Sequence, residues 1–154
     1  MIVLANDHGG LTLKQPIIEA LNELKLPFMD IGTNSAESTD YPLWGYKAAR
    51  LVASGECEKG IIMCGTGVGI SLAANKVKGI RCVVCTDCYS AKLSRAHNDA
   101  NILALGGRVV GPDLAKMIVR IWLETPFDGG ERHERRVKMI MDIERDQKLE
   151  TSLQ

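Results

Sequence analysis

The sequence predicts an α/β fold: a doubly wound, five-stranded parallel sheet with helices on both faces and a charged helix at the C-terminus. One observation and one general rule carry this prediction. Short apolar runs typical of strands alternate with segments whose apolar residues recur at helical spacing, along the whole chain. Strands that alternate with helices are joined by right-handed crossovers, which makes the sheet parallel and covers both of its faces. We expect one Rossmann-like domain over residues 1–154, with the flavodoxin-like strand order 2-1-3-4-5.

The first part of the chain supplies two strands and two helices. Ile2–Ala5 is predicted as a short buried strand. Apolar residues then recur at helical spacing over Leu11–Leu26, and Pro27 ends that helix. Phe28–Ile31 is predicted as the second strand, and after a polar loop Tyr41–Ser54 is predicted as the second helix.

The remainder of the chain continues the alternation. Gly60–Cys64 is the third predicted strand and Val68–Lys76 the helix after it. Arg81–Cys85 and Asn101–Leu105 are the fourth and fifth strands, with a helix over Tyr89–Ala96 between them. Two further helices complete the pattern, one over Pro112–Leu123 and a charged one from about Glu131 to Arg145.

The composition excludes several classes of protein. The 154 residues include 19 basic and 19 acidic side chains, so the formal net charge is zero, whereas nucleic-acid binders usually carry a basic excess. No apolar run approaches the roughly 18 residues of a membrane span. The first apolar run is cut at once by polar residues, so we expect no signal peptide. We therefore expect neither a nucleic acid nor a membrane as a partner.

The cysteines indicate a reducing compartment. They are odd in number, which favours free thiols in a cytoplasmic protein over a disulfide framework. Cys82, Cys85 and Cys88 have a C-x-x-C-x-x-C spacing, but a structural zinc site needs four ligands and no second pair exists. We therefore predict no metal at these residues.

The fold places a ligand site beyond the carboxyl ends of the strands, where the winding reverses between the first and third strands. The loops after those strands are Asp7-His8-Gly9-Gly10 and the glycine-rich segment 64–69. Glycines let backbone N–H groups approach a ligand, and the following helix offers its positive end to an anion. That anion could be a phosphate, an enolate or the thiolate of Cys64, which could act as nucleophile or base. A tight turn around a buried inert thiol fits the same residues.

Histidines and arginines supply further candidates. His8 lies in the first of these loops, whereas His97 precedes the fifth strand and reaches the crevice only if a neighbouring subunit supplies it. Arg132 and Arg136 are four residues apart, so on a helix they share a face and could clamp a phosphate. Arg108 follows the fifth strand and is another candidate. A solvated charged helix is the alternative for the arginines.

Taken together, the motifs resemble the ribose-5-phosphate isomerase B family, which also includes allose-6-phosphate isomerases and galactose-6-phosphate isomerase subunits. They occur in the same order and at similar spacing over nearly the whole chain: Asp7-His8-Gly9-Gly10, Thr39-Asp40-Tyr41-Pro42, Cys64-Gly65-Thr66-Gly67-Val68-Gly69, Ala74-Asn75-Lys76, Leu93-Ser94-Arg95, His97-Asn98-Asp99, and Gly129-Gly130 with Arg132-His133. The resemblance implies a cofactor-free aldose–ketose isomerase of a sugar phosphate. No metal is needed if hydrogen bonds stabilise the enediolate intermediate of such a reaction. It also implies a homodimer or a dimer of dimers whose sites are shared between subunits.

The same resemblance assigns roles to residues. Cys64 matches the catalytic base, His97 matches the proton donor linked to ring opening, and Thr66 is expected to help hold the negative charge. The residues that match substrate contacts are Asp7, His8, Gly65, Thr66, Gly67, Val68, Gly69, Asn98, Arg108, Arg132 and Arg136. The predicted reaction interconverts ribose 5-phosphate and ribulose 5-phosphate through a cis-enediolate. A six-carbon substrate such as allose 6-phosphate is one alternative, and a non-catalytic phosphosugar-binding regulator is another.

Overall fold

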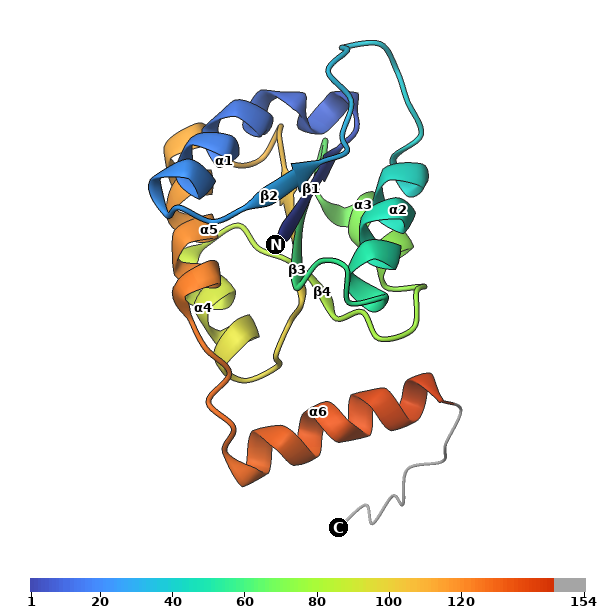
Figure 1. Cartoon of the computed structure of the whole chain (residues 1–154), viewed down its shortest axis with the longest axis vertical. Helices are drawn as coiled ribbons and strands as arrows, with labels where there is room; N and C mark the ends of the chain where they lie inside the picture. The colour runs from blue at the N-terminus through green and yellow to red at the C-terminus, as the bar shows by residue number, and fades with distance from the viewer. Residues whose placement is uncertain (146–154) are drawn as a thin grey trace.

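A computed structural model describes residues 1–145 and contains one five-stranded parallel sheet (Figure 1). The strand order is β2-β1-β3-β5-β4, so the predicted class and parallel pairing are confirmed, while the last two strands are exchanged relative to the order 2-1-3-4-5. β5 is buried throughout, whereas β4 has only three residues and two of them are half-buried, which suits an edge. The strands are β1 (Ile2–Asn6), β2 (Phe28–Asp30), β3 (Lys59–Cys64), β4 (Cys82–Val84) and β5 (Ile102–Gly106).

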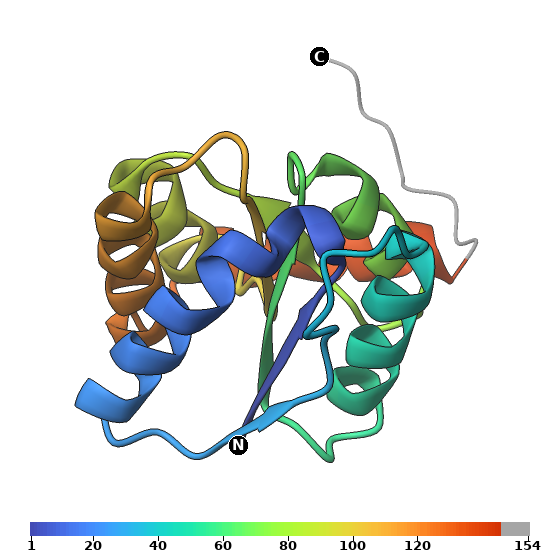
Figure 2. The ribbon, with the colours of Figure 1, turned by 90° about the horizontal axis from the view of Figure 1, so that it is seen from above.

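Helices cover both faces of the sheet, as the view in Figure 2 shows. One face carries α1 (Leu11–Glu23), α4 (Cys88–Ala96) and α5 (Pro112–Glu124), and the other carries α2 (Tyr41–Ala53) and α3 (Val68–Ala74). These bounds lie within a few residues of the predicted ones. A 3-10 turn, η1 (His8–Gly10), precedes α1 and was not predicted.

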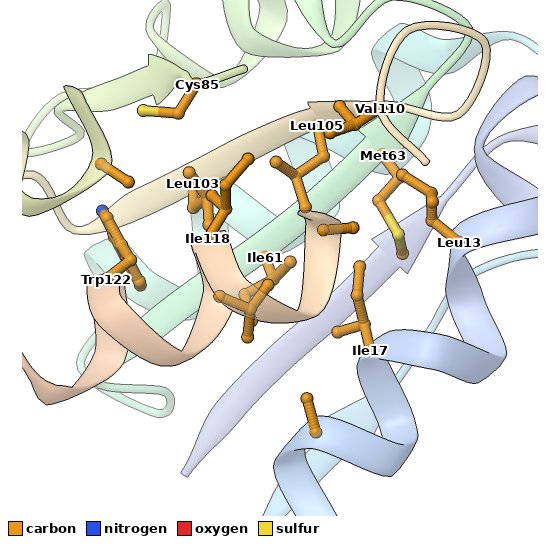
Figure 3. Packing of buried hydrophobic residues seen from close by; sticks show 14 of the residues in the cluster. Leu13, Ile17, Ile61, Met63, Cys85, Leu103, Leu105, Val110, Ile118 and Trp122 are labelled. Atoms are coloured by element: carbon orange, nitrogen blue, oxygen red, sulfur yellow. The ribbon is translucent and has the colours of Figure 1, made fainter. Parts of the chain in front are cut away.

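Successive residues of each strand point to opposite faces of the sheet, so the core is divided into two clusters. This alternation also determines the face to which Cys64, the last residue of β3, points. Ile61 and Met63 point to the cluster under α1 and α5 (Figure 3), whereas Ile62 and Cys64 point to the cluster under α2 and α3. On α5 the buried residues follow a helical stripe that includes the fully buried Trp122. Each fully buried large apolar side chain contributes about 1.5–3 kcal/mol to folding, so this core fixes the strand ends firmly.

The charged helix α6 (Glu131–Glu144) lies apart from the two helical layers, beside the end of the sheet at which the strands begin (Figure 1). The Gly79 N–H donates to both carboxylate oxygens of Glu144, at 2.9 and 3.0 Å, which holds α6 near the start of β4. Met139, Ile140 and Ile143 remain exposed on it. Within residues 1–145 no helix has the length and apolarity that crossing a membrane requires. Residues 146–154 of the predicted domain lie outside the described residues.

Candidate active site

A cavity of about 220 Å³ opens at the carboxyl ends of β1 and β3, where the sequence predicted the ligand crevice. Residues of four loops or helix starts meet there, although they are far apart in the sequence. The lining consists of Asp7, His8, Gly9, Tyr41, Cys64, Gly65, Thr66, Gly69 and Arg108. Seven of these nine were predicted as site residues, and Gly9 and Tyr41 were not.

The loop after β3 is built around the sulfur of Cys64. The Gly67 N–H donates a hydrogen bond to Cys64 Sγ at 3.1 Å. Gly67 has a φ of +79°, and a Cβ there would lie 3.0 Å from the carbonyl carbon of Leu105, so only glycine fits. Cys64 is 4% exposed and lines the cavity. The sulfur therefore lies just before the start of α3, with one backbone N–H aimed at it.

The loop after β5 is tied to the loop after β3 and positions an arginine over it. The Gly107 N–H donates to the Cys64 carbonyl at 2.8 Å, and the Arg108 N–H donates to the Gly65 carbonyl at 3.0 Å. Arg108 Nη1 lies 3.5 Å from where a Cβ of Gly65 would stand. The Val68 N–H donates to Thr66 Oγ1 at 3.3 Å. A cation and several backbone amides therefore surround the loop in which Cys64 lies.

The loop after β1 is held by its own polar side chains. Asp7 Oδ1 accepts the Gly10 N–H at 3.0 Å, and His8 Nδ1 accepts the Thr39 N–H at 3.2 Å. His8 Nδ1 also lies 3.9 Å from Asp7 Oδ2, but a nitrogen that accepts a hydrogen bond carries no proton to give to a carboxylate. We therefore assign the proton of neutral His8 to Nε2.

Tyr41 also lines the cavity, although no pattern in the sequence assigns it a role there. Its ring packs on Gly69 so closely that a Cβ there would lie 2.7 Å from two ring carbons. Tyr41 was part of a matched motif, but its position at the start of α2 indicated only a helix boundary. Gly9 was missed for a similar reason, because its close approach to the backbone of Gly65 joins two segments that are distant in the sequence.

The remaining predicted site residues do not line this cavity. Val68, 51% exposed, begins α3 and, like Gly67, does not border the cavity. His97 caps the C-terminus of α4, and Asn98 lines a hollow beside α6. Arg132 and Arg136 are exposed on α6, at the end of the sheet opposite Cys64. The predicted set is thus divided between the two ends of the sheet.

His97 lies in a cluster with two residues that were not predicted as site residues. The rings of His97 and His133 are stacked, with centroids 4.2 Å apart and planes inclined by 8°. His133 Nε2 lies 3.4 Å from Asp128 Oδ2. His133 belongs to a matched motif, but its contact with His97 depends on how the loop before α6 runs.

All five cysteines lie in the described part of the chain and are free. Burial, with a contribution from Asp87, raises the pKa of Cys85 to about 11, and burial also raises the pKa of Cys82 well above its usual range. The one group of potential metal ligands among residues 1–145 contains none of them.

Comparison with known proteins identifies the class. Residues 2–140 match the model of the family described as Ribose/Galactose Isomerase. The chain is 54% identical over 143 residues to the ribose-5-phosphate isomerase B of Escherichia coli, covering 93% of this chain and 95% of that protein. It is also similar to the structure of Clostridium thermocellum ribose-5-phosphate isomerase B, with a TM-score of 0.91, 55% identity, and coverage of 94% and 97%.

A third relative has a named ligand. The structure of Mycoplasma genitalium ribose-5-phosphate isomerase B with bound ribulose-5-phosphate matches with a TM-score of 0.89 and 39% identity, covering 94% of this chain and 96% of that one. Fold, site and relatives together define an aldose–ketose isomerase of sugar phosphates. More particularly, the chain belongs to the Ribose/Galactose Isomerase family, so the predicted resemblance is confirmed.

Proposed function

We propose that the protein interconverts ribose 5-phosphate and ribulose 5-phosphate without a cofactor. The observation that carries this proposal is the position of Cys64, whose sulfur lies at the crevice with a backbone N–H aimed at it. The E. coli relative is named for the same substrate, and the M. genitalium relative is named with the corresponding ketose bound. The five free thiols also fit the cytoplasmic location that we propose for the enzyme.

Ring opening is the first chemical step. Ribose 5-phosphate is largely a furanose, so a proton must move from the anomeric hydroxyl to the ring oxygen before the aldehyde forms. His97 moves this proton, because an imidazole donates and accepts protons near neutral pH. Asp7 and His8 contact the sugar at the crevice.

Proton transfer between C2 and C1 follows. The Cys64 thiolate takes the proton from C2, the C–H electron pair forms the C1–C2 double bond, and the carbonyl oxygen becomes the oxyanion of a cis-enediolate. A proton then moves from the C2 hydroxyl to the C1 oxyanion, and the same sulfur returns its proton to C1 while the C2 oxygen forms the carbonyl of the ketose. Thr66 and the amides of Gly65 and Gly69, which border the crevice, hold the developing negative charge, and this stabilisation is usually the largest catalytic contribution.

The phosphate end of the substrate is held by arginines. Arg108 borders the crevice, and Arg132 and Arg136 share one face of α6. A guanidinium group donates two parallel hydrogen bonds to a phosphate. Contacts at the phosphate end therefore fix the orientation of the reacting carbons at the other end of the sugar. Asn98 adds a substrate contact beside His97.

We propose that each site combines two copies of the chain in a homodimer or a dimer of dimers. Cys64 pairs in register with Gly106 at the end of β5, whereas His97 precedes the first residue of that strand. At about 3.3 Å per strand residue, the two groups are more than 13 Å apart along the sheet. A second copy can bring its own His97, Asn98, Arg132 and Arg136 to the crevice. The exposed apolar residues of α6 offer a surface for this contact.

A coupled isomerase assay in the presence of EDTA tests the proposal. We expect turnover of ribose 5-phosphate, with a higher kcat/KM than for allose 6-phosphate. A higher kcat/KM for allose 6-phosphate than for ribose 5-phosphate would favour the six-carbon alternative. That substrate requires a deeper pocket between the reacting end of the sugar and the arginines. Activity lost in EDTA would indicate a metal-dependent reaction, and binding of both sugars without turnover would favour the non-catalytic regulator.

A further inference from the structure

We infer that His97, Asp128 and His133 form a binding site for a divalent transition cation of the zinc type, and that its occupancy inhibits the isomerase. The inhibition rests on the proposed function of His97, whereas the binding site rests on the structure alone. Nitrogen and oxygen atoms from these three side chains all lie within 4.8 Å of one another.

Three separate elements meet in this cluster. His97 ends α4, Asp128 lies in the loop between α5 and α6, and His133 is in the first turn of α6 (Figure 1). The cluster is shielded from solvent on one side, where the His133 side chain is 11% exposed, and open on the other, where the Asp128 side chain is 43% exposed. An ion can therefore enter from the side of Asp128.

Backbone hydrogen bonds preorganise the cluster. The Asp128 N–H donates to the carbonyl of Ala96 at 3.1 Å, which ties the loop to the end of α4. Asp128 Oδ1 accepts the Gly130 N–H at 3.0 Å, so Oδ2 is left facing His133. The His133 N–H donates to the Gly130 carbonyl at 2.8 Å. The carboxylate of Asp128 and the backbone of His133 are thus held in place independently of any ion.

The donor set selects the kind of cation. Two imidazoles and one carboxylate are typical ligands of Zn²⁺ and its neighbours in the transition series, whereas Mg²⁺ and Ca²⁺ prefer oxygen ligands throughout. Zn–N and Zn–O bonds of about 2.0–2.2 Å require the stacked rings to turn out of parallel and close on the ion. Three protein ligands leave a fourth position for water.

Coordination and ring opening compete for the same imidazole. A nitrogen of His97 that donates its lone pair to the ion can no longer exchange a proton, and the ion also fixes the ring. Zn²⁺ should therefore slow turnover of a furanose. In an aldotetrose 4-phosphate the C4 oxygen carries the phosphate, so no furanose ring forms and no ring opening is needed. Zn²⁺ should therefore slow the turnover of this substrate less.

Zn²⁺ itself is the probe, with the full-length, metal-free protein titrated in competition with a chromogenic chelator. We expect one Zn²⁺ per chain, no competition from millimolar Mg²⁺, and at least tenfold weaker binding for Asp128→Asn and His133→Gln. Asp113→Asn removes an exposed carboxylate from the first turn of α5 and should bind like the unchanged protein. Thermal unfolding of each variant, measured without metal, verifies that it is folded.

Substitution of Co²⁺ for Zn²⁺ separates this site from the thiols. Nitrogen and oxygen ligands give visible bands alone, whereas coordination by Cys64 would add intense near-ultraviolet absorption from thiolate to metal. That absorption, or equal Zn²⁺ affinity of folded Asp128→Asn and unchanged protein, would overturn the site. Full turnover of ribose 5-phosphate with Zn²⁺ bound would overturn the inhibition. Zn²⁺ binding by a chain that isomerises no sugar phosphate would overturn the proposed function and the inhibition, and leave the site standing.

Discussion

The N–H of Gly67 donates to Cys64 Sγ at 3.1 Å from a left-handed backbone conformation with a φ of +79°. The turn that allows this hydrogen bond also starts α3, so the sulfur lies at the positive end of a helix. Both features place partial positive charge beside the sulfur, as the proposed role of Cys64 as base requires. The geometry of the glycine-rich loop thus agrees with the base that we propose.

Replacement of the sulfur should abolish catalysis while the fold survives. We expect Cys64→Ala to lower kcat for ribose 5-phosphate by about 10²–10⁴-fold, the range that a positioned base contributes. Cys57→Ala is the matched control, because Cys57 is a buried free thiol of the same core cluster and lies outside the crevice. Steady-state kinetics of both variants provide the measurement, and near-normal turnover by Cys64→Ala would exclude the sulfur as base.

Gly67→Ala should damage activity more than stability. A left-handed alanine costs about 1–2 kcal/mol, and the added Cβ also meets the backbone of Leu105. Gly79→Ala is the control, because Gly79 has a φ of +87° with nothing within 4 Å of an added Cβ. Urea unfolding and kinetics should show a loss of stability in both variants and a large loss of kcat in Gly67→Ala alone. Equal kcat values in the two variants would contradict the role of the Gly67 donor.

His97→Asn should separate ring opening from isomerisation. We expect a fall of about 10²-fold or more in kcat/KM for ribose 5-phosphate, since proton transfer by a positioned imidazole is lost. Turnover of an aldotetrose 4-phosphate, which needs no ring opening, should remain. If both substrates lose activity equally, His97 serves the enediolate step and its proposed role is wrong.

The buried thiol of Cys85 should make stability fall at alkaline pH. Its pKa is raised from 9.0 to about 11 in the folded chain, mainly by burial, so the unfolded chain loses this proton first as pH rises. The stabilising effect is therefore complete below pH 9 and is lost progressively towards pH 11, by about 2 kcal/mol. Urea unfolding at several pH values should show a steeper alkaline fall for the unchanged protein than for Cys85→Ala. Parallel curves would contradict the raised pKa.

Local patterns were sufficient to predict the elements, because apolar periodicity and proline positions act within each segment. The order of β4 and β5 was not predictable in this way. Both are short and apolar, and the choice of which lies beside β3 is made by packing across the whole sheet. A cavity does lie at the carboxyl ends of β1 and β3, where the carboxyl-end rule places a ligand, and that rule depends on topology alone.

The parts of the site that escaped prediction are contacts between distant segments. Tyr41 lies on Gly69, and Gly9 approaches Gly65, and neither contact leaves a periodic signal in the sequence. The local sequence around His133 indicates only a charged helix, and its stacking on His97 depends on the fold of the loop before α6.

Complementation between two inactive variants tests the central claim, that Cys64 and His97 act on one substrate from different copies of the chain. Cys64→Ala and His97→Asn are co-expressed with different affinity tags, and mixed dimers are purified through both tags. A mixed dimer contains one site with both groups intact and one with neither, so we predict recovery of up to about half of the unchanged activity on ribose 5-phosphate. Activity no higher than that of the single variants would contradict a shared site.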